Sequence, residues 1–255
     1  MTDIASRNIA VIFAGGVGSR MNHPDGPKQF IRVNDKPIIV YTLEHFQNHP
    51  AIDAVYIACL EEGLDLVKGY VAEYGLDKVK SIVKGGDSAQ ASIFNGLDAA
   101  MADAENDETT CVLIHDGVRP IINNKLIDDN IASVREFGSA ISSIPAFETV
   151  ARSLDGGKTV DDVENRDLMY ILQAPQSFRL GDIHSAHQRS ISEGMMGRFI
   201  DQAHMMNHYG HDIHMIDGFR GNIKITVPLD LAYFNFLVSS GEFEAVTGEP
   251  VPGEG

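Results

Sequence analysis

The stretch Asn8–Met21, NIAVIFAGGVGSRM, decides the fold of this chain. Its first part, Asn8–Phe13, is an apolar run typical of a buried strand, and a glycine-rich turn follows directly. Glycine has no Cβ, so the backbone of such a turn can approach a ligand and point its N–H groups at an anion. Arg20 and Lys28 add two positive charges to the same loop. A strand, a glycine turn and two cations in this order predict a nucleoside triphosphate site.

Two commoner phosphate loops do not match this stretch. The P-loop requires Gly-x4-Gly-Lys-Ser/Thr, and no such string occurs in the chain. The dinucleotide fingerprint requires Gly-x-Gly-x-x-Gly, but after Gly16 and Gly18 the third glycine is replaced by Met21. An ordinary strand-to-helix turn with a chance arginine is the simpler alternative. The string Pro27-Lys28-Gln29 makes that alternative the less favoured one.

Composition narrows the class of protein. With 255 residues, of which 44% are apolar, the chain can bury the core of one large α/β domain. No apolar run reaches the length of a membrane span, and the first residues do not resemble a secretory signal, so we expect a cytoplasmic protein. Cys59 and Cys111 fall in predicted buried strands and are expected to be core thiols.

The net charge of −16 bears on the substrate. It argues against a nucleic-acid-binding surface, and it repels anions at long range. A phosphate site in this chain must therefore be a local basic patch, which a divalent cation such as Mg²⁺ would assist.

Apolar runs alternate with helical patterns through the first half of the chain. The predicted strands are Asn8–Phe13, Ala54–Cys59, Val79–Val83, Cys111–Ile114 and Ala140–Ile144. Strands separated by helices predict a mostly parallel sheet, in which ligands bind beyond the carboxyl ends of the strands. Three loops with distinctive sequences fall at those ends: Gly15–Lys28, Gly85–Asp87 and His115–Pro120.

The second half is less regular. We interpret the stretch from Pro145 to Pro175 as a projecting β-hairpin arm that grips a second subunit. Helices are predicted at Leu180–Ser192, Arg198–Tyr209 and Pro228–Ser239, with a strand at Asn222–Thr226. Residues 1–240 then form one domain, with the arm at about 145–175, and the acidic tail 241–255, rich in Gly, Pro and Glu, is expected to be flexible.

Several side chains in these loops suit phosphate chemistry. Asp116 follows a strand, where a carboxylate suits Mg²⁺, and Arg119 can bind a second phosphate; a plain ion pair between them is the alternative. Ser88 after Gly85–Asp87 is a good helix N-cap, while the same backbone, with Ser92, can also read a nucleobase edge. Without other context, Lys224 is predicted to be an ordinary solvent-facing lysine.

Two other kinds of site are less favoured. The run His204, His208, His211 and His214 contains one i, i+4 pair, but the HExxH zinc motif is absent. A Ser/His/Asp hydrolase is not indicated because the chain has no Gly-x-Ser-x-Gly elbow.

Taken in order, these motifs resemble those of the sugar-alcohol-phosphate cytidylyltransferases over about residues 8–238. The matching strings are Ala14–Met21 with Pro27–Phe30, Gly85–Asp87 with Ser92, His115-Asp116-x-x-Arg119-Pro120, Thr149, Arg166, Gln173-x-Pro175-Gln176-x-Phe178 and Asn222–Thr226. The family includes enzymes for ribitol 5-phosphate and for 2-C-methyl-D-erythritol 4-phosphate.

The resemblance implies a Rossmann-like nucleotidyltransferase domain that forms a homodimer through the arm. It also implies a reaction of CTP with a polyol phosphate, giving a CDP-alcohol and pyrophosphate, with Mg²⁺ as the cation. The implied roles are catalytic for Arg20 and Lys28; CTP-binding for Ala14, Gly15, Gly16, Gly18, Gly86, Asp87 and Ser92; metal-binding for Asp116; and acceptor-binding for Arg119, Lys224, Thr149 and Arg166, the last two from the neighbouring subunit.

The chain also departs from the family pattern. Glu148-Thr149 replaces the usual Asp-Thr on the arm, and Ala174 replaces a threonine in the Gln-Thr-Pro-Gln string. Ile200-Asp201 replaces Thr-Asp, which leaves the role of Asp201 open, and Ala89 stands where an arginine is frequent. The strings Lys36–Glu44 and Met169-Tyr170 look like the ribitol branch. Ribitol 5-phosphate, for a CDP-ribitol supply to cell-surface polymers, is therefore the preferred acceptor.

Three alternatives remain. The first is the methylerythritol phosphate enzyme of isoprenoid synthesis, which shares the fold and the CTP site. The second is an NAD-dependent oxidoreductase, against which the missing third glycine and Lys28 argue. The third is a non-catalytic nucleotide-binding protein, which the presence together of Arg20, Lys28, Asp116, Arg119 and Lys224 makes less favoured. The sequence leaves open whether a partner reductase supplies the polyol phosphate.

Overall fold

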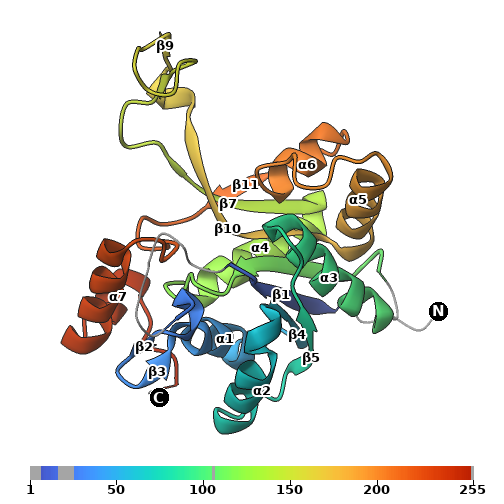
Figure 1. Ribbon diagram of the computed structural model, residues 1–255, viewed down its shortest axis with the longest axis vertical. Helices are drawn as coiled ribbons and strands as arrows, with labels where there is room; N and C mark the ends of the chain where they lie inside the picture. Colours follow the sequence, from blue (N-terminus) through green and yellow to red (C-terminus); the bar gives the residue numbers. More distant parts are fainter. Residues whose placement is uncertain (1–6, 17–25, 105–106, 254–255) are drawn as a thin grey trace.

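The computed structural model describes residues 7–16, 26–104 and 107–253, which form a three-layer α/β domain (Figure 1). The central sheet has seven strands in the order β11-β7-β10-β6-β1-β4-β5. Their bounds are β1 Asn8–Ala14, β4 Ala54–Cys59, β5 Val79–Lys84, β6 Cys111–Asp116, β7 Ser139–Pro145, β10 Tyr170–Arg179 and β11 Met215–Asp217. Strands β1, β4, β5 and β6 are parallel, whereas β10 runs antiparallel to both β6 and β7. The predicted mostly parallel sheet is confirmed.

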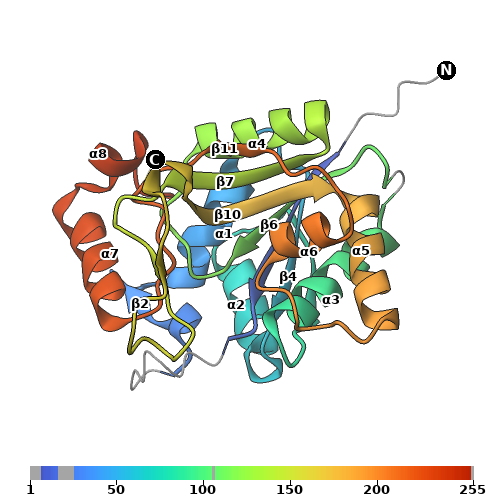
Figure 2. The same ribbon diagram turned by 90° about the horizontal axis from the view of Figure 1, so that it is seen from above.

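Helices cover both faces of this sheet (Figure 2). Their bounds are α1 Ile38–Asn48, α2 Leu64–Glu73, α3 Ala89–Ala102, α4 Asn124–Phe137, α5 Leu180–Ser192 and α6 Gln202–His208. Alternate residues of β1 point to opposite faces, as the pleat requires. Ala10 and Ile12 pack in one cluster with residues of α1, α2 and α4, while Ile9 and Val11 pack in another with α3, α5 and α6.

A glycine sets the distance between α3 and the sheet. A Cβ placed on Gly96 would lie 2.6 Å from Cγ1 of Val11, which is too close for any side chain. Helix α3 can therefore lie directly against β1, so the loop before α3 reaches the carboxyl end of β1. Strand β1 also has β4 on one side and β6 on the other, so the strand order reverses beside it. Such a switch point is where open α/β sheets bind ligands.

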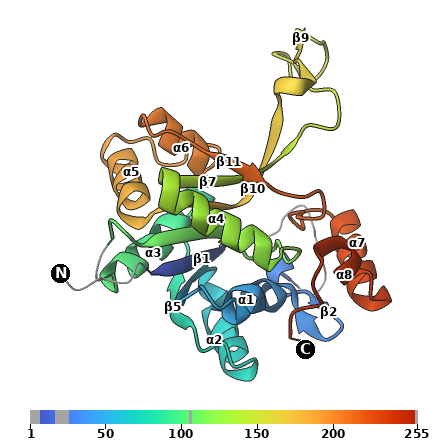
Figure 3. The same cartoon turned by 180° about the vertical axis from the view of Figure 1, so that it is seen from behind.

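Between β7 and β10 the chain leaves the body and returns, and this segment protrudes in Figures 1 and 3. It contains the short antiparallel pair β8 (Ala151–Arg152) and β9 (Asp162–Val163), followed by the 3-10 turn η3 (Arg166–Leu168). Large apolar side chains are exposed on it, including Leu154 at 80% and Leu168 at 70%. We refer to residues 146–169 as the arm.

The C-terminal part packs against the loop that follows β6. Helix α7 (Pro228–Ser240) and helix α8 (Phe243–Thr247) pack with the small β2–β3 ribbon (Arg32–Val33 and Lys36–Pro37) in a third core cluster. Phe243 is fully buried there and Val251 nearly so, while Nζ of Lys36 donates a hydrogen bond to the carbonyl of Pro252. A flexible tail from residue 241 does not fit these contacts, because its few apolar residues fill gaps in the core.

Two other predictions are wrong. Residues 222–226 are extended but are not a strand, because their backbone hydrogen bonds go to a loop and to side chains instead of a neighbouring strand. The helix expected at Arg198–Tyr209 begins only at Gln202, where Asp201 caps it. Cys59 and Cys111 are free and buried, as expected for core thiols. No helix among the described residues is long and apolar enough to cross a membrane.

Candidate active site

Two adjoining cavities open at the carboxyl ends of β1 and β6. The larger, of about 530 Å³, we call the glycine cavity, and the smaller, of about 180 Å³, the glutamine cavity. The glycine cavity is lined by Phe13, Ala14, Gly15, Gly16, Lys28, Gln29, Leu60, Gly86, Asp87, Ser88, Ala89, Asp116, Val118, Lys224 and Thr226. Phe13, Ala89, Asp116 and Lys224 also line the glutamine cavity. A ligand in each cavity would therefore meet the other at Asp116 and Lys224.

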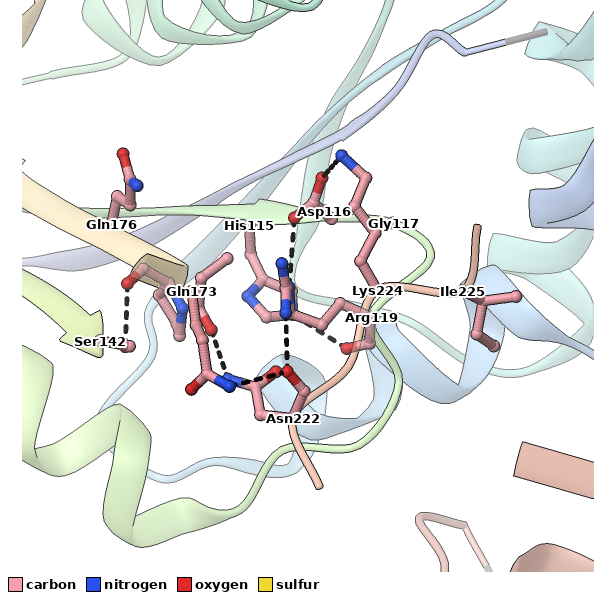
Figure 4. A network of polar contacts seen from close by, with 12 residues as sticks. His115, Asp116, Gly117, Arg119, Ser142, Gln173, Gln176, Asn222, Lys224 and Ile225 are labelled. Atoms are coloured by element: carbon pink, nitrogen blue, oxygen red, sulfur yellow. Dashed lines mark hydrogen bonds and ion pairs between the residues drawn. The ribbon is translucent and has the colours of Figure 1, made fainter. Parts of the chain in front are cut away.

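The shared wall carries three charges (Figure 4). One carboxylate oxygen of Asp116 lies 2.6 Å from Nζ of Lys224, and the other lies 3.2 Å from Nε of Arg119. Burial alone would raise the pKa of this carboxyl, but the positive charges of Lys224 and Arg119 outweigh that effect and lower the pKa of Asp116 to about 2. The carboxylate is therefore ionised at neutral pH, and it holds both cations at the junction of the cavities.

The extended segment Asn222–Thr226 is held by side chains from distant parts of the chain. Nη1 of Arg119 donates to the carbonyl of Asn222 at 2.7 Å, and Nζ of Lys28 donates to the carbonyl of Ile225 at 2.9 Å. The amide of Asn222, itself fully buried, donates to the carbonyl of Ala174 on β10. The segment thus fixes the position of Lys224, which the sequence alone presented as an ordinary surface lysine.

Two buried histidines support the loop that follows β6. Nε2 of His115 lies 3.0 Å from the carbonyl of Arg119, and Nε2 of His45 lies 2.9 Å from the carbonyl of Pro120. Because a carbonyl only accepts, each Nε2 carries the proton and donates. Burial lowers the pKa of His115 to about 3 and that of His45 to about 4, so both rings are neutral at pH 7. They fix the backbone from which Arg119 projects.

The loop before α3 is built around Ser92. Its Oγ accepts a hydrogen bond from the N–H of Gly86 and donates to the carbonyl of Ser88. A Cβ on Gly15 would lie 2.5 Å from this Oγ, so only glycine lets the β1 turn approach this loop. Ser88 caps α3 by accepting from the N–H of Ala91, as predicted. Among the described residues Ser92 lines neither cavity, and its contacts assign it to loop structure.

The structure brings most of the predicted site residues together. Ala14, Gly15, Gly16, Lys28, Gly86, Asp87, Asp116 and Lys224 line the glycine cavity, and Arg119 lines the glutamine cavity. Thr149 and Arg166 lie exposed in the arm. Gly18 and Arg20 lie outside the described residues.

Sequence reasoning missed several polar residues of the site. Gln29 is almost completely buried, and its amide donates to the carbonyl of Ala14 at the end of β1. The amide of Gln173 donates to the carbonyls of Phe219 and Asn222. Gln90 and Asp201 line the glutamine cavity. Gln29, Gln173 and Gln176 were quoted only as parts of motif strings, and Asp201 only as part of a departure from the family pattern. Nothing in the local sequence marks Gln90 as facing a ligand.

A magnesium site depends on Asp116. The described part of the chain contains no group of three or more His, Cys, Asp or Glu side chains that could hold a metal ion. Mg²⁺ commonly uses one or two carboxylates together with substrate phosphates, and the ionised Asp116 fits that lesser requirement. Both of its oxygens are ion-paired, so a cation bound there would share an oxygen with Lys224 or Arg119, or displace one of them.

The histidine run is explained by ring contacts. His204 and His208 both pack against Phe199, with ring centroids 5.3 and 5.1 Å apart. His214 stacks on Phe137 at 4.2 Å. These ring contacts give His204, His208 and His214 packing roles.

Comparison with known proteins agrees with the site. The family described as IspD, 2-C-methyl-D-erythritol 4-phosphate cytidylyltransferase, matches residues 8–240. A protein of Streptococcus agalactiae serotype III (strain NEM316) named ribitol-5-phosphate cytidylyltransferase is 46% identical over 94% of this chain and 99% of its own length. A Vibrio parahaemolyticus protein with the same name is 42% identical over 94% of this chain and 100% of its own length.

A relative with the other acceptor in its name is less similar than these two. A Clostridium botulinum (strain 657 / Type Ba4) protein named 2-C-methyl-D-erythritol 4-phosphate cytidylyltransferase is 34% identical over 89% of this chain and 95% of its own length. Among solved structures, the Francisella tularensis enzyme of that name superimposes with a TM-score of 0.75 at 26% identity, covering 91% of this chain and 99% of that one.

Proposed function

Because the chain belongs to the IspD family of cytidylyltransferases, we propose that it transfers the cytidylyl group of CTP to D-ribitol 5-phosphate, giving CDP-ribitol and pyrophosphate. This choice of acceptor is supported by the relatives: those named for ribitol 5-phosphate reach 46% identity, whereas those named for methylerythritol phosphate reach 36%. The observation that carries the proposal is the wall between the cavities, because it places cations where two phosphorylated substrates would meet.

CTP fits the glycine cavity. Gly15 and Gly16 have no side chain to cover the backbone, so their N–H groups can face phosphate oxygens. Nζ of Lys28 is anchored on the carbonyl of Ile225 and provides a fixed positive charge in this cavity. We assign to Lys28, together with Arg20, stabilisation of the charge that develops on the phosphates. Ala14, Gly86 and Asp87 would contact the nucleoside, on a loop that Ser92 keeps in shape.

The acceptor fits the glutamine cavity. Arg119 and Lys224 would bind its phosphate, since both lie on the wall shared with the CTP cavity or directly beside it. Elsewhere the cavity is lined by polar side chains that include the uncharged Gln90, Gln173 and Gln176, and these suit a chain of hydroxyl groups. An acceptor bound in this direction presents a phosphate oxygen to the α-phosphorus of CTP.

The reaction requires no protein base. An oxygen of the acceptor phosphate, already ionised near pH 7, forms a bond to the α-phosphorus. The bond from that phosphorus to the bridging oxygen of the β-phosphate breaks, and pyrophosphate leaves with the electron pair. Catalysis then consists of alignment by the two cavities and of charge stabilisation by Lys28, Arg20 and Lys224. The neutral, buried His115 and His45 are consistent with this, because they bind carbonyls and are not placed to exchange protons.

A divalent cation would complete the charge balance. Asp116 would hold Mg²⁺ together with phosphate oxygens of CTP, and the ion would neutralise the triphosphate during the transfer. The protein keeps Asp116 ionised through the positive charges of Lys224 and Arg119. Chelation should therefore stop turnover without unfolding the protein.

We further propose that the arm pairs with a second copy in a homodimer. Its exposed apolar residues, such as Leu154 and Leu168, favour a protein partner. Thr149 and Arg166 lie in this segment and would reach the acceptor in the neighbouring subunit. A cytoplasmic location and a partner reductase that supplies the polyol phosphate also remain predictions.

Pyrophosphate release in the presence of Mg²⁺ and CTP tests the proposal. We expect turnover with ribitol 5-phosphate and a kcat/KM at least tenfold lower with 2-C-methyl-D-erythritol 4-phosphate. The reverse preference would identify the methylerythritol enzyme. No release with either acceptor would contradict the assignment as an enzyme of this family.

A further inference from the structure

The glutamine cavity contains an acidic side chain that its proposed ligand does not require for phosphate binding. Asp201 lies at the start of α6, is half-buried, and lines the cavity together with Arg119 and Lys224. A negative charge in a phosphate-binding cavity weakens phosphate binding near it. Any role of Asp201 in the cavity must therefore be other than phosphate binding.

The carboxylate of Asp201 is fixed in place. Oδ1 accepts the N–H of His204 at 2.8 Å, which caps α6, and Oδ2 accepts the amide of Gln176 at 2.9 Å. The same Gln176 accepts the N–H groups of Gln202 and Ala203 through its Oε1, so its own orientation is determined. A carboxylate has about four lone-pair sites, and these two bonds leave the others to a ligand.

The backbone at Asp201 is fixed as well. The amide of the buried Gln90 donates to the carbonyls of Phe199 and Asp201, at 3.3 and 3.4 Å. Gln90 and Gln176 come from α3 and β10, on opposite sides of the residue. Both glutamines also line the cavity. The carboxylate is thus held by residues of the cavity itself, as expected of a preorganised ligand contact.

We propose that Asp201 is a specificity residue that accepts hydrogen bonds from hydroxyl groups of the acceptor and, by repelling phosphate, directs the phosphate end toward Arg119 and Lys224. The inference rests on the proposed function, since it concerns the acceptor of that same site. A hydroxyl can only donate to an ionised carboxylate, so Asp201 favours a polyol chain over a second anionic group. Together, the two cations and Asp201 determine the orientation in which the acceptor binds in the cavity.

The test compares Asp201→Asn and Asp201→Ser with the intact protein. Asn and Ser are both good N-caps, so α6 should be retained, and thermal unfolding verifies this. Asp212→Asn is the matched control, because it removes one negative charge from an exposed residue shortly after α6. Calorimetry measures the binding of ribitol 5-phosphate, of inorganic phosphate and of CTP to each protein.

We expect both Asp201 variants to bind ribitol 5-phosphate about 10- to 100-fold more weakly, the range for a lost hydrogen bond to a charged group. Inorganic phosphate should bind equally well or more tightly, and CTP should be unaffected. In a series of ribitol 5-phosphates that each lack one hydroxyl, at least one should bind the intact protein weakly and be weakened no further by Asp201→Asn. That analogue identifies the hydroxyl that Asp201 binds.

Equal weakening of ribitol 5-phosphate and inorganic phosphate would overturn the proposal, and so would equal weakening of every analogue, because Asp201 would then only shape α6. Ligand binding can be measured without turnover, so the role of Asp201 can be tested separately from the proposed transferase activity. If methylerythritol phosphate binds in place of ribitol phosphate, the same comparison is made with it. Loss of both ligands from the intact protein overturns both proposals, whereas tight binding that is independent of Asp201 overturns this one alone.

Discussion

Nζ of Lys224 lies 2.6 Å from an oxygen of Asp116, and this pair joins the middle of the chain to its C-terminal part at the wall between the cavities. Arg119 engages the other oxygen of the same carboxylate and also the carbonyl of Asn222, two residues before Lys224. The three charges therefore depend on one another for their positions. A substitution at Asp116 should consequently affect stability as well as activity.

Asp116→Asn is expected to destabilise the protein in a pH-dependent way. The pKa of Asp116 is lowered to about 2, so its contribution is complete above the ordinary pKa of about 4 and is lost as the pH falls toward 2. At pH 7 the variant should lose about 2 kcal/mol of unfolding free energy, and the gap should close between about pH 4 and 2. Urea unfolding at several pH values measures it.

The exposed Asp65 provides a control, because it also pairs with a lysine but lies on the surface. Asp65→Asn should leave the unfolding midpoint nearly unchanged. A gap between Asp116→Asn and the intact protein that stays constant down to pH 2 would mean that the ion pairs are not its cause.

Lys28→Ala should reduce turnover far more than acceptor binding. Lys28 lines the CTP cavity and does not line the glutamine cavity, which we assign to the acceptor. Loss of a charge that stabilises the transition state should lower kcat by about 100- to 1,000-fold. The KM for the acceptor should change by less than about threefold, since the residues that we assign to acceptor binding are not substituted.

Steady-state pyrophosphate release gives both constants, and Lys68→Ala, at an exposed lysine, is the control. Because Lys28 also anchors Ile225, circular dichroism must show that the variant is folded. If kcat and the acceptor KM change by the same factor, Lys28 does not act on the transferring phosphoryl group.

Acid should destabilise the fold well before carboxylates are protonated. Burial lowers the pKa of His45 and His187 to about 4 and that of His115 to about 3. The unfolded chain binds a proton at each near pH 6.5 while the folded chain does not, so stability falls as the pH drops from about 6.5 to 4. Each histidine contributes about 1.4 kcal/mol per pH unit within that range.

His45→Gln isolates one of these protons. The glutamine amide can still donate to the carbonyl of Pro120, but it does not titrate. Between pH 6.5 and 4 the stability of this variant should fall less steeply than that of the intact protein, by the slope that corresponds to one proton. An unaltered slope in His45→Gln would show that this ring is accessible to protons in the folded state.

The sequence revealed the parts of the fold that local patterns determine. Strands β1, β4 and β6 are long apolar runs, and α5 has the predicted bounds because its periodicity is uninterrupted. The predicted arm, which ends at Pro175, includes the first part of strand β10, because Gln173 and Pro175 are atypical of a central strand. Residues 222–226 alternate like a strand, yet the groups that bind their backbone, Arg119 and Lys28, are distant in sequence.

The residues of the candidate site also fall into two groups, those that the local sequence predicts and those that it does not. The glycines, Lys28 and Asp116 stand beside strands, and their positions follow from the sheet. Gln29 and Asp201 are polar residues whose contacts come from other elements, so no local pattern marks them. Buried polar groups are explained by their partners, and partners are known only once the chain is folded.

The arm permits a test of shared active sites. If Arg166 binds the acceptor of the neighbouring subunit, Arg166→Ala inactivates its partner's site, while Lys28→Ala inactivates its own. Each homodimer is then deficient in both sites. In a mixed dimer, the subunit that carries Arg166→Ala keeps its Lys28 and receives an intact arm, so one of the two sites is complete. Co-expressed, differently tagged subunits should therefore recover about half of the normal activity per dimer. Mixed dimers as inactive as their parents would place Arg166 outside the site, and a monomer in solution would exclude the arm from dimerisation altogether.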